Sequence, residues 1–420
     1  MDLLDFHCQA GESATDRSLV RPSPRPIPST GTRGHFRRKA GIAMVGSVVW
    51  SETPAGEPAW HVSRYREVKT LMEDGRLVMN HPNPEAAPWY TDSPMHRVMV
   101  RLAAGPIPKG GSDHEERAAR RAAMTRIFAP RNLRHASPNV QATSDLLLDK
   151  LASGPPPVDL HEAYSIPLCA SAVCELLGVP ADDIALFRQW ADDKDSPDMR
   201  RAMVGLRDLT RYVKLLVERR REEPGDDIVS LLLATESEDE FHVGRTTNLV
   251  TWMLGLGWQV AASAIDFGIL TLLAHPDQFA LLRADPSLAD SATEEVLRHF
   301  NATAAPRNGL DRYAGEDIEI DGVLIKSGDM VLLDVPAANH DPEVFADPDV
   351  FDIRRSPNPH LTFGHGFYFC NFNKVARTEV SVGLSALCGR FPNLRLAVDP
   401  AELSFMKHPQ SGPVRLPVAW

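Results

Sequence analysis

Cysteine is scarce in this chain. The five residues among 420 are odd in number and irregularly spaced, which excludes a disulfide framework. No C-x-x-C pair or histidine-rich cluster accompanies them, so the sequence offers no zinc site. The first residues carry neither a basic start nor an apolar core, so we expect no signal peptide. These absences favour a reducing, cytoplasmic location.

An excess of positive charge is also missing. The chain has 45 lysines and arginines against 56 aspartates and glutamates, a formal charge of -11. A nucleic-acid binder would need a basic footprint, so we expect no nucleic-acid partner. The sequence holds no Gly-rich phosphate loop, no G-x-S-x-G elbow and no H-E-x-x-H motif. An acidic enzyme with other chemistry fits this balance.

Long hydrophobic runs are rare, and residues 249–274 form the one run long enough to suggest a transmembrane helix. Gln259, Asp266 and three glycines interrupt it, and basic flanks are absent. A helix that is apolar all round either spans a membrane or lies at the centre of a large domain. We expect the buried central helix, and no membrane partner.

The remaining pattern indicates one large domain. Residues 1–35 are rich in Pro, Ser, Arg and Gly and are expected to form a flexible extension. Residues 44–64 suggest two strands around a turn, residues 113 onward are helical for most of two hundred positions, and residues 316–335 alternate as strands do. We expect a mainly α fold with a small β part, as a single domain over residues 36–420.

Chemistry is concentrated in residues 358–380. Two glycines loosen a loop that presents Cys370 just before a helical run, where the helix dipole and unpaired N–H groups stabilise a thiolate. A buried structural cysteine is the alternative for any isolated residue of this type. The neighbouring residues decide between them.

This loop resembles the cysteine-ligand loop of the haem-thiolate monooxygenases, the cytochrome P-450 family. The family pattern F-G-x-G-x-H-x-C-x-G-x-x-x-A-R is matched by Phe363, Gly364, Gly366, Cys370, Ala376 and Arg377. Two positions depart from it, with Tyr368 in place of the usual His and Phe372 in place of the usual Gly. The resemblance implies the P-450 fold, haem b as cofactor, Cys370 as the iron ligand, and Phe363 and Gly364 beside the cofactor.

A buried E-x-x-R pair is a second landmark of the family, and Glu295 and Arg298 match it. Alone, such a pair would be a solvated surface ion pair. The family joins it to a further arginine, but Val350 occupies that position here. Either His360 or Arg355 could complete the network.

Haem propionates are bound in this family by basic residues. The resemblance places Arg312 in this role, because a guanidinium donates two parallel hydrogen bonds to a carboxylate. A helix ending in F-x-P-R adds Arg121, with Arg117 where His is common, and Tyr368 could donate one more bond. An exposed loop arginine is the alternative for Arg312.

The central helix departs most from the family. Its A-G-x-[DE]-T-[TS] motif aligns with Gly257, Gln259 and Val260, so that a glutamine and a valine replace the acid and the alcohol that deliver protons for oxygen activation. Glutamine does not titrate and valine has no proton to relay. Bound water or a substrate hydroxyl could carry protons instead. The resemblance implies a substrate pocket with candidates Trp252, Gly255, Leu256, Gln259, Val260 and Asn308.

Three functions therefore remain open. The first is an ordinary monooxygenase that oxidises a small secondary metabolite with electrons from ferredoxin and ferredoxin reductase. The second is a haem-thiolate catalyst that does not activate oxygen: nitrene-type N-heterocycle formation from an N–O substrate, peroxide-driven oxidation or rearrangement. The third is a haem-free partner of another enzyme, which the retention of Cys370, Arg312 and Arg121 disfavours.

Overall fold

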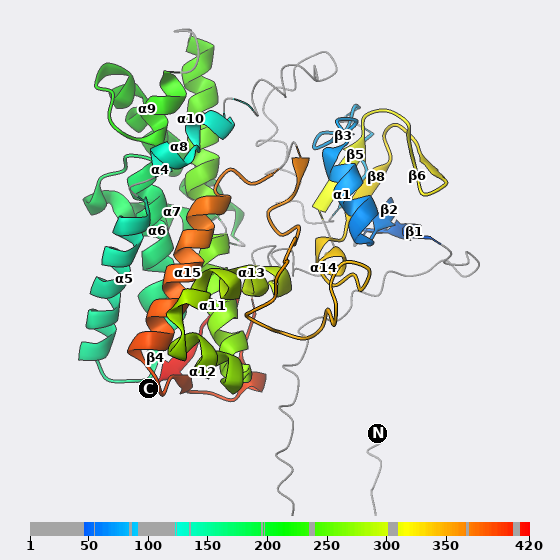
Figure 1. Ribbon diagram of the computed structural model, residues 1–420. Coiled ribbons are helices and arrows are strands. Elements are labelled where there is room, and N and C mark those ends of the chain that lie inside the picture. The colour runs from blue at the N-terminus through cyan, green and yellow to red at the C-terminus, as the bar shows by residue number, and fades with distance from the viewer. Residues whose placement is uncertain are drawn as a thin grey trace, which may run out of the picture.

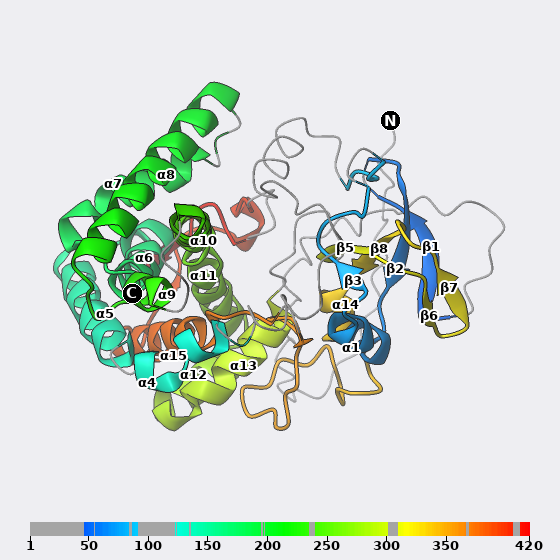
Figure 2. The same ribbon diagram turned by 90° about the horizontal axis from the view of Figure 1, so that it is seen from above.

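A computed structural model describes residues 46–53, 55–83, 86–90, 122, 124–133, 136–194, 196, 198–234, 240–300, 310–366, 369–405 and 412–420. These residues form a larger helical part beside a smaller part built on a sheet (Figure 1, Figure 2). The expected mainly α fold with a small β part is confirmed. The expected extension, residues 1–35, lies outside the described residues.

The helical part contains most of the chain. Its helices are α4 (Pro130–Leu133), α5 (Ala136–Ser153), α6 (Ile166–Leu176), α7 (Ile184–Lys194), α8 (Met199–Glu222), α9 (Ile228–Leu233), α10 (Glu240–Leu256), α11 (Gln259–Ala274), α12 (Pro276–Ala284), α13 (Ala289–His299) and α15 (Asn373–Arg390). A π-helical turn, His161–Ser165, precedes α6. Local chemistry sets several boundaries: the Asp198 carboxylate, for example, accepts the N–H of Arg200 at 2.8 Å and begins α8.

The sheet part holds the first strands of the described chain. A five-stranded sheet has the order β1 (Val48–Glu52), β2 (Pro58–Val62), β8 (Met330–Leu333), β5 (Leu310–Ala314) and β3 (Leu77–Val78). Strands β2 and β8 run parallel and the other neighbours antiparallel. Helices α1 (Tyr65–Glu73) and α14 (Val335–Ala338) pack beside the sheet, and β6 (Ile318–Ile320) pairs with β7 (Val323–Ile325). The three-stranded sheet of β4 (Val158–Asp159), β10 (Pro417–Ala419) and β9 (Arg395–Leu396) belongs to the helical part.

Helix α11 lies in the core of the helical part and packs against α15. Their approach is close: a Cβ atom added at Gly268 would lie 2.7 Å from Cδ2 of Leu384 on α15. The one acidic residue of α11, Asp266, is fully buried. Its carboxylate oxygens lie 2.5 Å from Nδ1 of His161 and 2.6 Å from Oγ of Ser165. Burial raises the pKa of Asp266, and the two hydrogen bonds act against that rise.

The apolar run 249–274 is not one helix, contrary to our expectation. It is divided between α10 and α11 by a break at Gly257 and Trp258. By length and composition, residues Val243–Ala274 could cross a membrane, but 71% of the most apolar window is buried inside the protein. That burial is typical of a core helix.

Candidate functional site

The cysteine loop lies between the sheet part and the start of α15. Gly364 and Gly366 have φ angles of 73° and 59°, a region that glycine enters without steric cost. A Cβ atom at Gly366 would lie 2.6 Å from the carbonyl oxygen of Met72, so this position also needs the absence of a side chain. The Cys370 N–H donates to the Phe363 carbonyl at 2.8 Å. The loop is thereby closed on itself and seated against the end of α1.

Cys370 differs from the other described cysteines in its surroundings. Its residue is half-buried, whereas Cys169, Cys174 and Cys388 are buried in the helical core. Burial raises the pKa of the Cys174 and Cys388 thiols to about 12, and that of Cys169 well above its usual range. Within the described part of the chain, Cys370 is therefore the cysteine that is least buried.

A chain of polar contacts joins the backbone of Cys370 to α13. The amide of Asn373 donates to the Cys370 carbonyl at 2.6 Å, and its oxygen accepts from Nη1 of Arg377 at 3.0 Å. Arg377 also donates two hydrogen bonds to Glu294, at 2.6 and 3.0 Å. Its guanidinium lies 4.4 Å from the ring centroid of Phe363. The arginine of the cysteine motif thus holds both ends of the loop.

Glu294 is the acceptor at the far end of this chain. It also accepts from Nε2 of His360, at 3.1 Å. Burial alone would raise the pKa of Glu294, but the hydrogen bonds from His360 and Arg377 outweigh it and lower the pKa to about 2. Glu294 is ionised at neutral pH, and it fixes Arg377 against the loop.

Phe372, which replaces the family's glycine, is accommodated without backbone strain. It precedes α15 with φ −81°, so the position does not require glycine. Its ring centroid lies 4.9 Å from that of Phe128, at the end of the helical segment before α4. The substitution ties the cysteine helix to that segment by an aromatic contact.

The Glu295–Arg298 pair is buried against the segment that leads into the cysteine loop. Arg298 donates to both carboxylate oxygens, at 2.8 and 2.9 Å, and to the carbonyls of Asn339 and Pro348. Of our two candidates for the third member, the structure places Arg355 there, with Nε 3.2 Å from Glu295. His360 is hydrogen-bonded to Glu294 instead. Burial would raise the pKa of Glu295, but the hydrogen bonds, led by Arg298, hold it well below its usual range.

Arg312 lies in β5 and is half-buried, with Nη1 2.7 Å from the carbonyl of Asp311. Four other candidates, Arg117, Arg121, Asn308 and Tyr368, lie outside the described residues. Asn373 was not among the predicted site residues, because its role depends on a hydrogen bond to the backbone. Its place three residues after the cysteine was the available signal.

On the central helix, the candidate residues surround the break between α10 and α11. Gly255 lies in the last turn of α10, and Trp252 is 46% exposed one turn earlier. Gln259 and Val260 begin α11, and Val260 packs against the core. Leu256 ends α10, and the position of its side chain lies outside what the structure describes.

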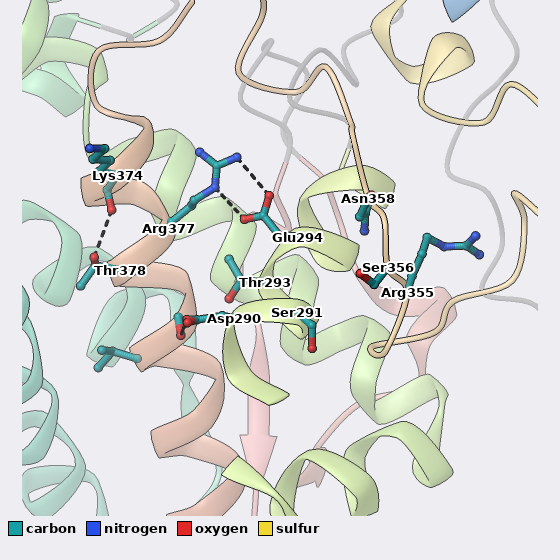
Figure 3. Close-up of a pocket in the computed structure, with 12 residues that line it drawn as sticks. Asp290, Ser291, Thr293, Glu294, Arg355, Ser356, Asn358, Lys374, Arg377 and Thr378 are labelled. Carbon is teal, nitrogen blue, oxygen red and sulfur yellow. Dashed lines mark hydrogen bonds and ion pairs between the residues drawn. The ribbon is translucent and has the colours of Figure 1, made fainter. Parts of the chain in front are cut away.

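A polar pocket of about 710 Å³ lies between α13, α15 and residues 355–358, beside the cysteine loop. Figure 3 shows the Arg377–Glu294 pair between the two helices. Three further side chains line the pocket. Arg355 donates a hydrogen bond to Glu295, Ser381 donates to Asp290 at 2.9 Å, and Lys374 is exposed to solvent. The lining therefore combines three cationic side chains, Arg355, Lys374 and Arg377, with two acidic ones, Asp290 and Glu294.

Comparison with known proteins identifies the family. The Cytochrome P450 family model matches residues 181–402. Pentalenolactone synthase of Streptomyces exfoliatus is 37% identical over 85% of this chain and 89% of its own length. Nocardicin C N-oxygenase of Nocardia uniformis subsp. tsuyamanensis is 34% identical, over 87% and 91%. The solved structure of substrate-free PimD, a pimaricin epoxidase, matches with a TM-score of 0.76 and 34% identity over 89% and 93%. The chain belongs to the cytochrome P450 family.

Proposed function

We propose that this haem-thiolate oxidoreductase oxidises a small secondary metabolite in bacterial natural-product biosynthesis, with its protons supplied by bound water or by the substrate. As a cytochrome P450, the protein uses haem b. When bound, the haem supplies an iron centre whose reactivity a thiolate ligand tunes by donating electron density. Cys370 is the ligand we assign, because it is the one described cysteine that is only half-buried and it lies just before the N-terminus of α15. We place this activity in the cytoplasm.

The remaining site residues position the cofactor and the substrate. Arg312, Arg117, Arg121 and Tyr368 are assigned to the haem propionates, and Phe363 and Gly364 to the loop that borders the ring. Substrate contacts are assigned to the residues around the helix break: Trp252, Gly255, Leu256, Gln259, Val260 and Asn308. For Arg312, the support is a half-buried strand position from which a guanidinium can donate two parallel bonds.

The observation that carries the proposal is the start of α11. Gln259 and Val260 replace the acid and the alcohol by which the family supplies protons, and neither side chain can relay a proton at neutral pH. A monooxygenase inserts one oxygen atom of O2 and releases the other as water, which consumes two protons and two electrons. In this chain those protons must pass through water or come from a hydroxyl of the substrate.

The same observation supports a second function that requires no oxygen activation. A substrate with a weak N–O or O–O bond brings its own leaving group, so the proton relay at Gln259 and Val260 is dispensable. This would allow N-heterocycle formation, peroxide-driven oxidation or rearrangement. One relative is named for chemistry at nitrogen, nocardicin C N-oxygenase, which makes a nitrogen-centred substrate reasonable here.

Electrons for the first function would come from ferredoxin and ferredoxin reductase. Arg126, Arg131 and Lys374 are exposed, and the contact between Phe128 and Phe372 brings the first two close to the start of α15. In a protein of formal charge -11, a local group of cations beside the cysteine loop suits an acidic electron donor.

Two measurements test the proposal in sequence. A carbon monoxide difference spectrum of the reduced protein must show the haem-thiolate band, and its absence would end both catalytic functions. Turnover under argon of a substrate with an N–O bond then separates them. Product that forms only with oxygen and reductant supports the first function, whereas product under argon supports the second.

Restoring the relay tests the observation itself. The double variant Gln259→Glu, Val260→Thr is expected to raise NADPH-driven oxygenation per oxygen consumed, because it returns a titratable acid and a hydroxyl. Gln259→Asn with Val260→Ala is the matched control, since it perturbs the same positions without either group. Equal coupling in the two double variants would contradict the role assigned to these positions.

A further inference from the structure

The break between α10 and α11 has its own hydrogen-bonding arrangement. The Gly257 N–H donates to the Met253 carbonyl at 2.8 Å, which continues the α-helical pattern to the end of α10. The pattern resumes where the Ala262 N–H donates to the Trp258 carbonyl at 3.0 Å. Helix breaks leave carbonyl oxygens without their usual backbone donors, and these oxygens need other partners, often water.

At this break the Leu254 carbonyl has a side-chain donor. In an uninterrupted helix it would accept from the backbone N–H four residues later, which belongs to Trp258. It accepts instead from the indole Nε1–H of the same residue, at 2.9 Å. The indole therefore reaches back from the break onto the last turn of α10. Trp258 is only 3% exposed and packs in the hydrophobic core, so its ring occupies buried space that a smaller residue would leave as a cavity, with the Leu254 carbonyl at its wall.

The backbone next to the tryptophan is fixed as well. A Cβ atom at Gly257 would lie 2.5 Å from the Met253 carbonyl oxygen, so no other residue fits this turn without a shift. The same Cβ position is 3.8 Å from a methyl group of Val173 on α6, which covers that side of the break. Trp258 itself has φ −94° and ψ −29°, so its indole is held without backbone strain.

We propose that Trp258 is a positioning residue that closes the break between α10 and α11 to water and so removes a solvent route for protons to Gln259 and Val260. The indole does this in two ways: it fills the space, and it satisfies the Leu254 carbonyl that would otherwise recruit a water molecule. This inference rests on the proposed function, because it explains why protons must come with the substrate or its bound water.

Two substitutions separate the two contributions. Trp258→Phe removes the N–H but keeps an aromatic ring that fills part of the space, and Trp258→Ala removes both. Trp50→Phe is the control, since Trp50 lies in β1, in the sheet part. Hydrogen–deuterium exchange of peptides covering residues 253–264 is measured on the holoenzyme. Exchange is expected to rise on the order of tenfold in Trp258→Ala, less in Trp258→Phe, and not in Trp50→Phe.

A second readout follows the protons. The solvent deuterium isotope effect on NADPH-driven oxygen consumption is expected to change in Trp258→Ala and to stay constant in Trp50→Phe. Unchanged exchange in both Trp258 variants would overturn the proposal, and Trp258→Phe keeps this test valid if Trp258→Ala does not fold. Raised exchange with an unchanged isotope effect would also overturn it, because water would then enter without carrying protons. Turnover under argon, measured on the wild type, decides the proposed function separately.

Discussion

At the scale of single residues, Arg298 anchors the segment that leads into the cysteine loop. It is fully buried and bonds both oxygens of Glu295 as well as three backbone carbonyls. Removing one member of such a pair leaves a buried charge without its partner. Arg298→Leu is therefore expected to lower the free energy of unfolding by about 3–5 kcal/mol, measured by urea denaturation.

An exposed ion pair provides the control for this prediction. Lys214 and Glu218 lie 3.8 Å apart on the surface of α8. Lys214→Ala is expected to change the free energy of unfolding by no more than about 0.5 kcal/mol. If Arg298→Leu cost as little as this, the buried pair would not anchor the loop.

Glu294 predicts a dependence on pH. Its pKa falls from 4.5 to about 2 on folding, so the stability it contributes is present above about pH 4.5 and is lost as the pH falls towards 2. At neutral pH this contribution is on the order of 2 kcal/mol, reduced by the partial exposure of the carboxylate. Glu294→Gln should be less stable than wild type at pH 7, and the difference should narrow between pH 4.5 and 3. Thermal unfolding across this range measures it, and a difference independent of pH would refute the prediction.

Some of the residues that support the cysteine loop could be predicted from the sequence, and others could not. The spacing of Glu295 and Arg298 places both on one face of a helix, but the resemblance to the family was needed to distinguish the buried pair from a solvated surface ion pair. The third member was not predictable between Arg355 and His360, since the fold of residues 339–358 decides it. Asn373 was missed because a hydrogen bond to a backbone carbonyl leaves no pairing pattern in the sequence.

At the scale of elements, the approach of α11 to α15 fixes the central helix relative to the cysteine helix. A Cβ atom at Gly268 would lie 2.7 Å from Leu384 and 3.0 Å from Val296, inside a packed core. Gly268→Ala is therefore expected to cost about 1–3 kcal/mol of stability, although alanine is the better helix former. It should also weaken haem retention, because the two helices would separate.

Gly244→Ala in α10 is the matched control. Nothing lies within 4 Å of the Cβ atom that this substitution adds, so helix propensity alone should act and stabilise the protein by up to about 1 kcal/mol. Calorimetric unfolding and the haem content of both purified variants give the comparison. Equal stabilisation of both would show that α11 and α15 can separate freely.

The break in the central helix marks the limit of sequence analysis at this scale. Residues 249–274 are apolar enough for one helix, and neither Gly257 nor Trp258 forces an interruption by propensity alone. The structure reveals the break through the hydrogen bond from the Trp258 indole to the Leu254 carbonyl. In an intact helix this carbonyl would accept from the backbone N–H of Trp258 instead. Helix α6 packs beside this break, and helix propensity does not record such a tertiary contact.

At the scale of the whole molecule, the order of the landmarks was more informative than any one of them. Along the chain, the central helix, the E-x-x-R pair and the cysteine loop occur in the order and at the spacing of the family. This order was the basis for predicting the fold. What could not follow is the contact of Phe372 with Phe128, which joins segments more than two hundred residues apart. This contact shows how Phe372, which replaces the family's glycine, is accommodated in the family fold.

Charge at this scale gives the last prediction. The exposed Lys374 lies at the first turn of α15, beside the cysteine loop, in a protein of formal charge -11. Lys374→Glu is expected to slow reduction by an acidic ferredoxin severalfold at low salt, and this difference should shrink as salt screens the encounter. Lys150→Glu makes the same change of charge on α5. The neighbouring Asp149 accepts a hydrogen bond from Arg390, which ends α15 roughly 24 Å from Lys374 along that helix. Stopped-flow reduction under carbon monoxide measures both variants. If the two slow equally, net charge alone guides the donor; if only Lys374→Glu slows, the donor docks beside the cysteine loop.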